Sequence, residues 1–427
     1  MIFRLLVVAA IALSTTAAPG TATGQASLTG RWVGQILINR AVMPMEIEVS
    51  ATAEEVVLYL PELIDRRALK ATRKDGGLAV ELPFGLGNTL LSPSPQGHVL
   101  ATAPGTTAVT LRSAPRLDFV VSEVIVPTEG GPLPATLYMP AKASKSPAIL
   151  LAGGATAQSR HHGSVVSWCH HFVRRNLACL VTDRRPDGSG GQGSDIERDA
   201  RELRAALRYL RARPEVEPAR TGIASFSRGT WPALRVASLE PDLSFLFMTS
   251  AAALSPGESE KVSAHAKIAA AKRSPSEVAS VDDYYDLYFA VAAGRKSWEA
   301  LDQAARAAES APWGKFVDQP LEPAHLNFWR RNGAFSNAAD MARIKVPILA
   351  MWGGDDLIVP PAVHEPLLRK YLTATKSLRA VVFPGGDHPI EVPPGTDALG
   401  NFRMPRRAPG LIDQLDSWLI DQLTAKP

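Results

Sequence analysis

One segment, residues 221–234, constrains this chain more than any other. It reads Thr-Gly-Ile-Ala-Ser-Phe-Ser-Arg-Gly-Thr-Trp-Pro-Ala-Leu, so a short apolar run passes into a helix-compatible stretch without a spacer. A strand, a sharp turn and a helix packed this closely leave room only for small side chains two positions before and after the turn. Ser225 and Gly229 occupy those positions. The segment therefore predicts that Ser227 projects from a strained turn.

A serine hydroxyl is a weak nucleophile until a base removes its proton, so partners must come from elsewhere in the chain. One apolar run opens into Gly353-Gly354-Asp355-Asp356, and a later one opens into Gly385-Gly386-Asp387-His388. Loops that follow parallel strands meet at one edge of a sheet, where these residues could converge on Ser227. His388 would take the serine proton and return it to a leaving group, and the carboxylate would fix the imidazole tautomer.

Such an attack also needs N–H groups that stabilise the developing negative charge on the substrate oxygen. The residue after the nucleophile, Arg228, is expected to supply one through its backbone. The other is expected from the glycine turn Gly153-Gly154-Ala155, which follows an apolar strand at residues 148–152. We assign it to Gly154.

From residue 117 onward, continuous apolar runs alternate with helical patterns, which indicates a mostly parallel sheet with helices on both faces. The amphipathic helix expected at residues 195–213 carries Leu203, Leu207 and Leu210 on one stripe. A second helix is expected at residues 164–175. The expected strands are residues 119–127, 133–139, 148–152, 178–182, 222–224, 243–248, 347–352 and 380–383.

Two other regions follow different patterns. Residues 27–115 show short alternating runs separated by turn residues, at 31–38, 45–49, 56–60, 78–82, 99–103 and 108–111. This pattern predicts a small antiparallel β domain, either a sandwich or a barrel, without evident chemistry. Its His98 is interpreted as a surface or packing residue. Residues 255–342, within the domain spanning residues 116–427, are helix-like and rich in aromatic residues. This insertion is expected to form a lid whose rings mostly pack its own core, with a minority facing the site.

Taken together, these motifs resemble the α/β-hydrolase superfamily, and in particular the branch of exported bacterial esterases and serine-aminopeptidase-like proteins with a β-rich N-terminal domain. The matching residues cover most of residues 117–427. They are Gly153-Gly154 with Arg160, Asp183-Arg184-Arg185, the turn at Ser227, Gly353-x-x-Asp356-x-x-Val359-Pro360, and His388. The family pattern places the acid at the fourth position of its glycine turn, which selects Asp356 over Asp355.

The chain departs from the family pattern in two places. Ser225 stands where glycine is usual, and no histidine precedes Gly153. The second departure leaves the identity of the second oxyanion donor open.

The resemblance implies a serine hydrolase that cleaves an acyl bond, foremost a carboxylic ester of a small molecule, through an acyl-Ser227 intermediate and without a metal or organic cofactor. A peptidase or thioesterase would use the same triad. A dehalogenase is disfavoured because that chemistry uses a carboxylate nucleophile. From another class, a catalytically silent binding protein that recognises its ligand through the β-rich domain remains an alternative.

Residues 1–26 have the charged start, short apolar core and small residues of a secretory signal peptide, so the protein is expected to be secreted or periplasmic. A retained N-terminal anchor is the lesser alternative. No later segment has the length and apolar character of a membrane span. The net charge of +4, with acids interspersed among the basic residues, argues against a nucleic-acid partner.

The cysteine residues and the remaining histidine residues are interpreted as structural rather than as metal ligands or catalytic groups. Cys169 and Cys179 form either a disulfide or two buried thiols. A metal site is disfavoured for the histidine pairs His161-His162 and His170-His171, which lack a carboxylate at helical spacing. Asp183 is interpreted as a structural hydrogen-bond acceptor, and His364 as a solvated or capping residue.

Overall fold

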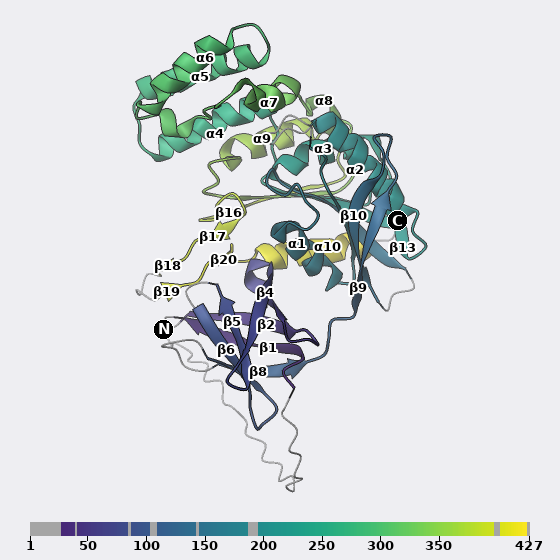
Figure 1. Cartoon of the computed structure of the whole chain (residues 1–427). Coiled ribbons are helices and arrows are strands. Elements are labelled where there is room, and N and C mark those ends of the chain that lie inside the picture. Colours follow the sequence, from purple (N-terminus) through teal and green to yellow (C-terminus); the bar gives the residue numbers. More distant parts are fainter. Residues whose placement is uncertain are drawn as a thin grey trace, which may run out of the picture.

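The structure is a computed structural model, and it describes residues 27–38, 41–83, 87–102, 109–141, 145–186, 195–396 and 402–424. The expected signal peptide at residues 1–26 lies outside these described residues. The described chain forms three parts: an N-terminal β-barrel, a central sheet with helices on both faces, and a helical cap (Figure 1). None of the helices in these ranges combines the length and apolar character that a membrane span requires.

The N-terminal part is a closed antiparallel barrel, in which the first strand pairs with both the second and the eighth. Met43, Met45 and Ile47 alternate along the second strand and are almost fully buried, so they fill the barrel interior. The strands are β1 (Gly30–Ile38), β2 (Ala41–Val49), β3 (Glu55–Leu60), β4 (Asp65–Lys74), β5 (Gly77–Leu82), β6 (Gly87–Pro93), β7 (Val99–Thr102) and β8 (Val109–Ala114).

The periodicity of the sequence did not indicate β4 or β6. In β4, only Leu69 and Ala71 pack toward the barrel core, and most of the other side chains are exposed, four of them charged. Its place in the barrel is set by backbone pairing with β3 on one side and β5 on the other. Hydrophobic alternation cannot reveal a strand whose position is set by its neighbours.

The central sheet has eight strands in the order β16-β15-β14-β13-β11-β12-β10-β9. The β9–β10 and β10–β12 pairs are antiparallel and the remaining pairs are parallel, so the sheet is mixed. The strands are β9 (Phe119–Val126), β10 (Leu133–Pro140), β11 (Ser146–Ala152), β12 (Ala178–Thr182), β13 (Val216–Phe226), β14 (Leu246–Thr249), β15 (Ile348–Gly353) and β16 (Leu378–Phe383).

Helices cover both faces of this sheet. On one face, α2 (Ile196–Arg211), α3 (Thr230–Leu239) and α9 (Pro361–Tyr371) pack in a common apolar core. On the other face, α1 (Gly163–Val173) and α10 (Leu411–Thr424) pack in a second one. Two short ribbons lie between β16 and α10, formed by β17 (Glu391–Val392) with β20 (Arg406–Arg407) and by β18 (Gly395–Thr396) with β19 (Phe402–Arg403).

The two cysteines form a disulfide that joins α1 to β12. Cys169 and Cys179 are both fully buried, and their Cα atoms are 5.3 Å apart. This resolves the choice that the sequence left open between a bridge and two thiols. The bridge ties the helix to the strand that follows it.

The barrel packs on the α1 and α10 side of the central sheet (Figure 1). Across the junction, the backbone N–H of Arg66 donates to Ser167 Oγ over 2.9 Å. Glu46 of β2 accepts hydrogen bonds from Arg174, which caps α1, at 2.6 and 3.0 Å, and from Arg31. The junction therefore contains paired charges as well as apolar contacts.

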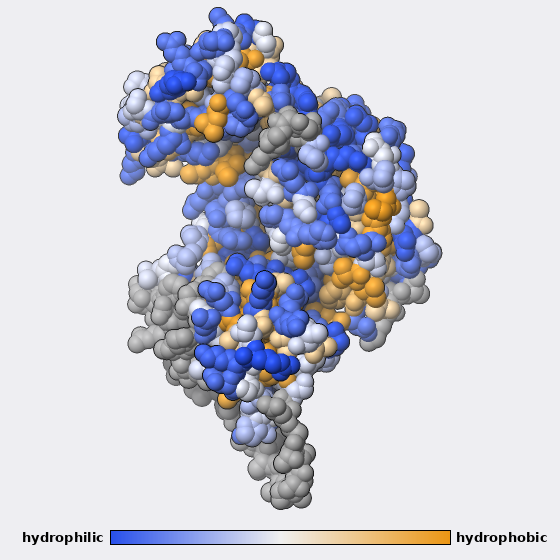
Figure 2. Space-filling view, viewed as in Figure 1, coloured by the Kyte–Doolittle hydropathy of each residue, from blue (hydrophilic) through white to orange (hydrophobic). Residues whose placement is uncertain are grey.

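The cap lies between β14 and β15 and consists of α4 (Pro256–Ala270), α5 (Pro275–Ala292), α6 (Trp298–Glu309), α7 (Asn327–Asn332) and α8 (Ala338–Met341), with 3₁₀ turns at Gly314–Phe316 and Pro323–Leu326. Capping boxes start α4, with Ser255 and Glu258, and α5, with Ser274 and Glu277. The outer surface of the cap is mainly hydrophilic, as expected for a solvent-facing layer (Figure 2).

Most of the cap's aromatic residues pack in its own core, as expected. Phe328 and Phe335 instead pack against the core of the main sheet. The rings of the cap core are Tyr284, Tyr285, Tyr288, Phe289, Trp298, Trp313, Phe316 and Trp329.

Candidate active site

Ser227 lies immediately after β13, where a single 3₁₀ turn, Ser227–Gly229, leads into α3. Its φ of 51° is in the left-handed region, which is strained for a residue with a side chain. A Cβ on Gly229 would lie 2.3 Å from the backbone oxygen of Ala152, so only glycine fits there. Ser225 fits where glycine is usual because its buried hydroxyl donates to Phe247 O over 3.3 Å.

His388 lies in the loop after β16 and reaches Ser227. Its Nε2 is 2.8 Å from Ser227 Oγ, and its Nδ1 is 3.0 and 2.9 Å from the two carboxylate oxygens of Asp356. The hydroxyl of Ser250 donates to the backbone oxygen of His388 over 2.6 Å and so helps to fix its loop. With Nδ1–H donating to the carboxylate, Nε2 is the acceptor for the serine proton.

Asp356 follows β15 and is almost completely buried, whereas its neighbour Asp355 is exposed. Its Oδ1 accepts the backbone N–H groups of Ile358 and Val359, each over 2.8 Å. Burial acts to raise the pKa of Asp356, but the hydrogen bond and charge of His388 and these two N–H groups together hold it below the usual value. The carboxylate is therefore anionic and oriented toward the imidazole.

The expected oxyanion donors border the same place. Gly154 lies beside Ser227, because a Cβ built on it would be 3.7 Å from Ser227 Cβ. Ala155, the next residue, lines the cavity into which Ser227 opens, and Arg228 lines it as well. The structure thus brings both predicted donor residues, Gly154 and Arg228, next to Ser227, and Ala155 lines the same cavity as Ser227 and Arg228.

A cavity of about 680 Å³ extends from Ser227 to the underside of the cap. Aromatic and aliphatic side chains make up much of its wall. The sequence predicted that the cap would line a cavity, but not which of its side chains would do so. The apolar lining comprises Trp231, Phe316, Val317, Leu321, Phe328, Trp329, Ile358 and Val359.

The cap also contributes two carboxylates to this cavity, Glu260 and Asp318. Tyr285 donates to Glu260 over 3.0 Å, and Tyr288 donates to Asp318 over 2.6 Å. Burial raises the pKa of Glu260. The sequence contained no signal for these residues, because only the folding of α4 and α5 places them together with the 3₁₀ turn at Gly314–Phe316.

The remaining polar residues singled out in the sequence lie outside this arrangement. Asp183 accepts the backbone N–H of Arg160 over 2.8 Å and pairs with its guanidinium, as a structural acceptor would. His162 caps α1 by accepting the N–H of Ser164. Among the described residues, no group of three or more His, Cys, Asp or Glu side chains is arranged to hold a metal ion.

His364 was expected to be solvated or to cap a helix, and that expectation is wrong. The residue is fully buried in α9, and its Nδ1 accepts the backbone N–H of Ala253 over 3.1 Å. Burial lowers the pKa of His364 to about 4, so the ring is neutral near pH 7. The helix turns this histidine inward, toward the segment that follows β14, which its sequence neighbours did not indicate.

The sheet topology and the places of these loops in the chain order decide the fold. Counted along the chain from β9, Ser227 follows the fifth strand, Asp356 the seventh and His388 the eighth, and the glycine turn beside Ser227 follows the third. The chain has the α/β-hydrolase fold. In α/β hydrolases the nucleophile sits on a strained strand-to-helix turn, and an N–H from the loop after the third strand completes the oxyanion hole. Ser227 and the Gly153–Ala155 turn occupy these places.

No protein-family model matches the sequence, and no curated protein matches it either. Solved structures similar to it include Est1E from Butyrivibrio proteoclasticus, at 14% identity and a TM-score of 0.43, covering 71% of this chain and 99% of that one. The carboxylesterase EstE1 from a metagenomic library has 16% identity and a TM-score of 0.41, covering 72% and 90%. A 2,6-dihydroxy-pseudo-oxynicotine hydrolase has 18% identity and a TM-score of 0.44, covering 71% and 68%. The assignment of the fold rests on the strand order.

Proposed function

We propose that this protein is an exported serine hydrolase that cleaves carboxylic esters through an acyl-Ser227 intermediate. The observation that carries the proposal is the continuous chain of hydrogen bonds from Ser227 Oγ through His388 to the buried carboxylate of Asp356. A hydroxyl, an imidazole and a carboxylate in this order convert serine into a nucleophile.

In the proposed reaction, His388 Nε2 accepts the hydroxyl proton as Ser227 Oγ attacks the ester carbonyl carbon. The carbonyl oxygen becomes an oxyanion, for which the backbone N–H of Arg228 and an N–H of the Gly154–Ala155 turn are the donors. The imidazolium, stabilised by Asp356, then protonates the leaving alkoxide as the acyl–alcohol bond breaks. Water, deprotonated by His388, then attacks the acyl carbon, and the imidazolium returns this proton to Ser227 Oγ as the acyl–serine bond breaks and the carboxylic acid leaves.

The cavity supports a substrate with a sizeable apolar group. Its volume of about 680 Å³ exceeds the space that a short acyl group alone would fill. Phe316, Phe328 and Trp329 from the cap line it. We therefore expect esters with a medium-length or aromatic group to be preferred over acetates.

Export to the periplasm or the medium is part of the proposal. It rests on the signal-like residues 1–26 and agrees with the buried disulfide, since disulfides persist in oxidising compartments.

The proposal is tested by incubating the purified protein with a fluorophosphonate and locating the adduct by mass spectrometry. A label on Ser227, absent from a folded Ser227→Ala variant, is expected; no label on Ser227 would favour a non-catalytic binding protein. A panel of p-nitrophenyl esters, thioesters and aminoacyl anilides then compares ester, thioester and amide cleavage. Higher kcat/KM for an anilide or a thioester than for every ester would overturn the ester assignment.

A further inference from the structure

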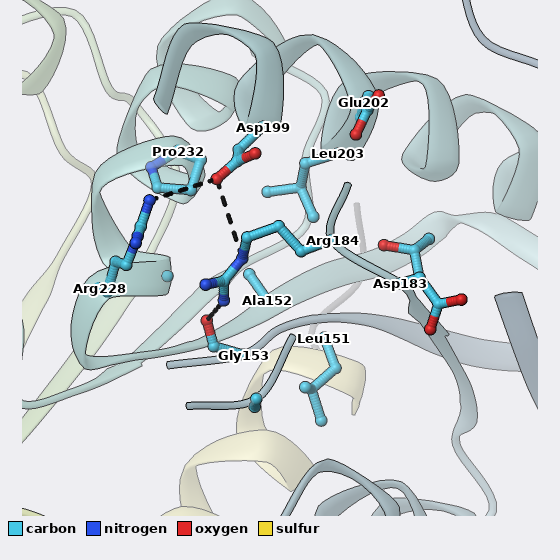
Figure 3. A pocket seen from close by; sticks show the side chains of 13 residues that line it. Leu151, Ala152, Gly153, Asp183, Arg184, Asp199, Glu202, Leu203, Arg228 and Pro232 are labelled. Carbon is cyan, nitrogen blue, oxygen red and sulfur yellow. Dashed lines mark hydrogen bonds and ion pairs between the residues drawn. The ribbon is translucent and has the colours of Figure 1, made fainter. Parts of the chain in front are cut away.

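Arg184 lies just beyond the end of β12 and binds the Gly153–Ala155 turn beside Ser227. Its Nη2 donates to Gly153 O over 2.9 Å and to Gly154 O over 2.6 Å, and its Nη1 donates to Ala155 O over 3.3 Å. Figure 3 shows the Arg184 guanidinium between the Gly153 carbonyl and Asp199 of α2. One side chain therefore binds three consecutive carbonyls.

These contacts fix the direction of the N–H groups as well. In a trans peptide, the carbonyl and the following N–H lie in one plane and point in opposite directions. Gly153 O and Gly154 O both point to Arg184, so the N–H groups of Gly154 and Ala155 point away from it. The lining of the two cavities agrees: Gly153 and Arg184 border a small pocket of about 50 Å³, whereas Ala155 borders the large cavity with Ser227.

The guanidinium of Arg184 is itself held in place. Asp199 of α2 lies 3.9 Å from Arg184 Nε and 4.0 Å from Arg228 Nη2, between the two arginines (Figure 3). The Arg228 guanidinium also lies 4.4 Å above the centre of the Phe328 ring. Asp199 thus connects the side chain of Arg184, which binds the glycine turn, with the side chain of Arg228, which follows Ser227.

We propose that Arg184 is the positioning residue of the oxyanion hole: by binding the carbonyls of Gly153, Gly154 and Ala155, it aims the N–H groups of this turn at the oxygen of the substrate bound at Ser227. This inference rests on the proposed serine hydrolase function. It does not make Arg184 a catalytic residue, because its contacts are with the turn and not with the substrate.

An arginine suits this role better than a lysine. Its planar guanidinium presents several N–H donors in a fixed geometry, so it can bind neighbouring carbonyls at once, whereas an ammonium acts as a single charged point. Burying the charge of Arg184 is unfavourable. Burial lowers the pKa of Arg184, whereas the negative charge of Asp199 raises it. A buried charge kept for packing alone would be replaceable by an apolar side chain.

The test compares Arg184→Gln and Arg184→Lys with the matched control Arg185→Gln. Arg185 is the next residue, and it pairs with Glu202 and donates to Gly131 O and Pro132 O, away from the turn. For each protein, the concentration of working sites is determined by end-point titration with a fluorophosphonate. We then measure kcat and KM per titrated site for a p-nitrophenyl ester, and Ki for a trifluoromethyl ketone, whose adduct with serine carries an oxyanion.

We expect Arg184→Gln to lower kcat per titrated site by about 100-fold and to weaken the ketone in similar proportion, with KM little changed. Arg184→Lys should retain more of both, and Arg185→Gln should match the wild type. Unchanged kcat per site and unchanged Ki in both Arg184 variants would overturn the inference. Loss of all titratable sites in these two variants alone would also overturn it, because Arg184 would then be needed for folding rather than for positioning the turn.

Wild-type protein that neither reacts with the fluorophosphonate nor hydrolyses any ester would reject the proposed function itself, and this is established before the variants are compared.

Discussion

His388 Nδ1 lies 2.9 Å from Asp356 Oδ2 although 32 positions separate the two residues in the chain. The carboxylate comes from the loop after β15 and the imidazole from the loop after β16, which are neighbouring parallel strands at the edge of the sheet. Asp356 is buried and accepts two further backbone N–H groups, so its orientation does not depend on His388. A preformed acid of this kind can hold the imidazole in one tautomer before any substrate binds.

Asp356→Asn tests this relationship. The amide is close in shape to the carboxylate, but it cannot stabilise an imidazolium and can present an N–H to the ring, which favours the wrong tautomer. We expect kcat to fall by about 10⁴-fold with the melting temperature little changed. Steady-state kinetics of a p-nitrophenyl ester measures the effect, with exposed Asp355→Asn as the control. Equal losses in the two variants would contradict the assignment of the acid.

The backbone strain at Ser227 predicts an order of stability among inactive variants. Ser227 has a φ of 51°, which glycine adopts freely and alanine does not. Ser227→Gly should therefore have a free energy of unfolding about 1 kcal/mol higher than Ser227→Ala, although glycine is usually the less stable residue. Urea denaturation of both variants gives the comparison. The reverse order would mean that the turn relaxes once the hydroxyl is removed.

Three buried histidines predict how stability changes with pH. Burial lowers the pKa of His170 to about 3 and the pKa values of His171 and His364 to about 4, whereas histidine in an unfolded chain has a pKa of about 6.5. As pH falls below about 6.5, the unfolded chain takes up protons that the folded protein does not, so the free energy of unfolding decreases down to about pH 4. With three such groups the slope can approach about 4 kcal/mol per pH unit.

Urea denaturation between pH 7.5 and pH 5 measures this slope. His364→Gln should reduce it by about one proton's contribution, or about 1.4 kcal/mol per pH unit at most. A stability that stays constant over this range would show that these rings are protonated in the folded protein.

Glu46 is part of the contact between the barrel and the central α/β part. This residue is paired with both Arg174 and Arg31, and its side chain is 14% exposed. Glu46→Gln would leave two guanidinium groups without their carboxylate, and we expect it to lower the free energy of unfolding by about 1–3 kcal/mol. Glu48→Gln is the control, because Glu48 pairs with Arg116 over 3.4 Å at the exposed surface. Chemical denaturation is the measurement, and similar losses in both variants would contradict this account.

The cavity wall predicts a change in substrate preference. Phe316 lies between the cap core and the cavity, so Phe316→Ala removes an apolar contact from a bulky substrate but not from a small one. We expect kcat/KM for p-nitrophenyl octanoate to fall about tenfold or more and that for the acetate to stay close to the wild type. Phe335→Ala, which changes a ring packed on the main core, should leave the ratio unchanged. A proportional loss on both esters would argue for general damage to the cap.

The individual elements show which parts of the sequence were informative. The apolar strands around Ser227 could be predicted because each is buried on both faces and reads as an unbroken apolar run. The strand β4 could not, since its side chains are largely exposed and its pairing is with distant neighbours. His364 was misjudged for a related reason, because a polar residue next to prolines carries no local sign that its helix turns it inward.

By itself, the sequence determined the chemistry available to this protein: a serine at a strand-to-helix turn, and an aspartate and a histidine after later strands, since short motifs and chain order are local properties. Only the tertiary structure decided what surrounds them. The closed barrel, the cap carboxylates facing the cavity, and the contact of Arg184 with three carbonyls all join residues distant in the chain, and such contacts are set by how the whole chain packs.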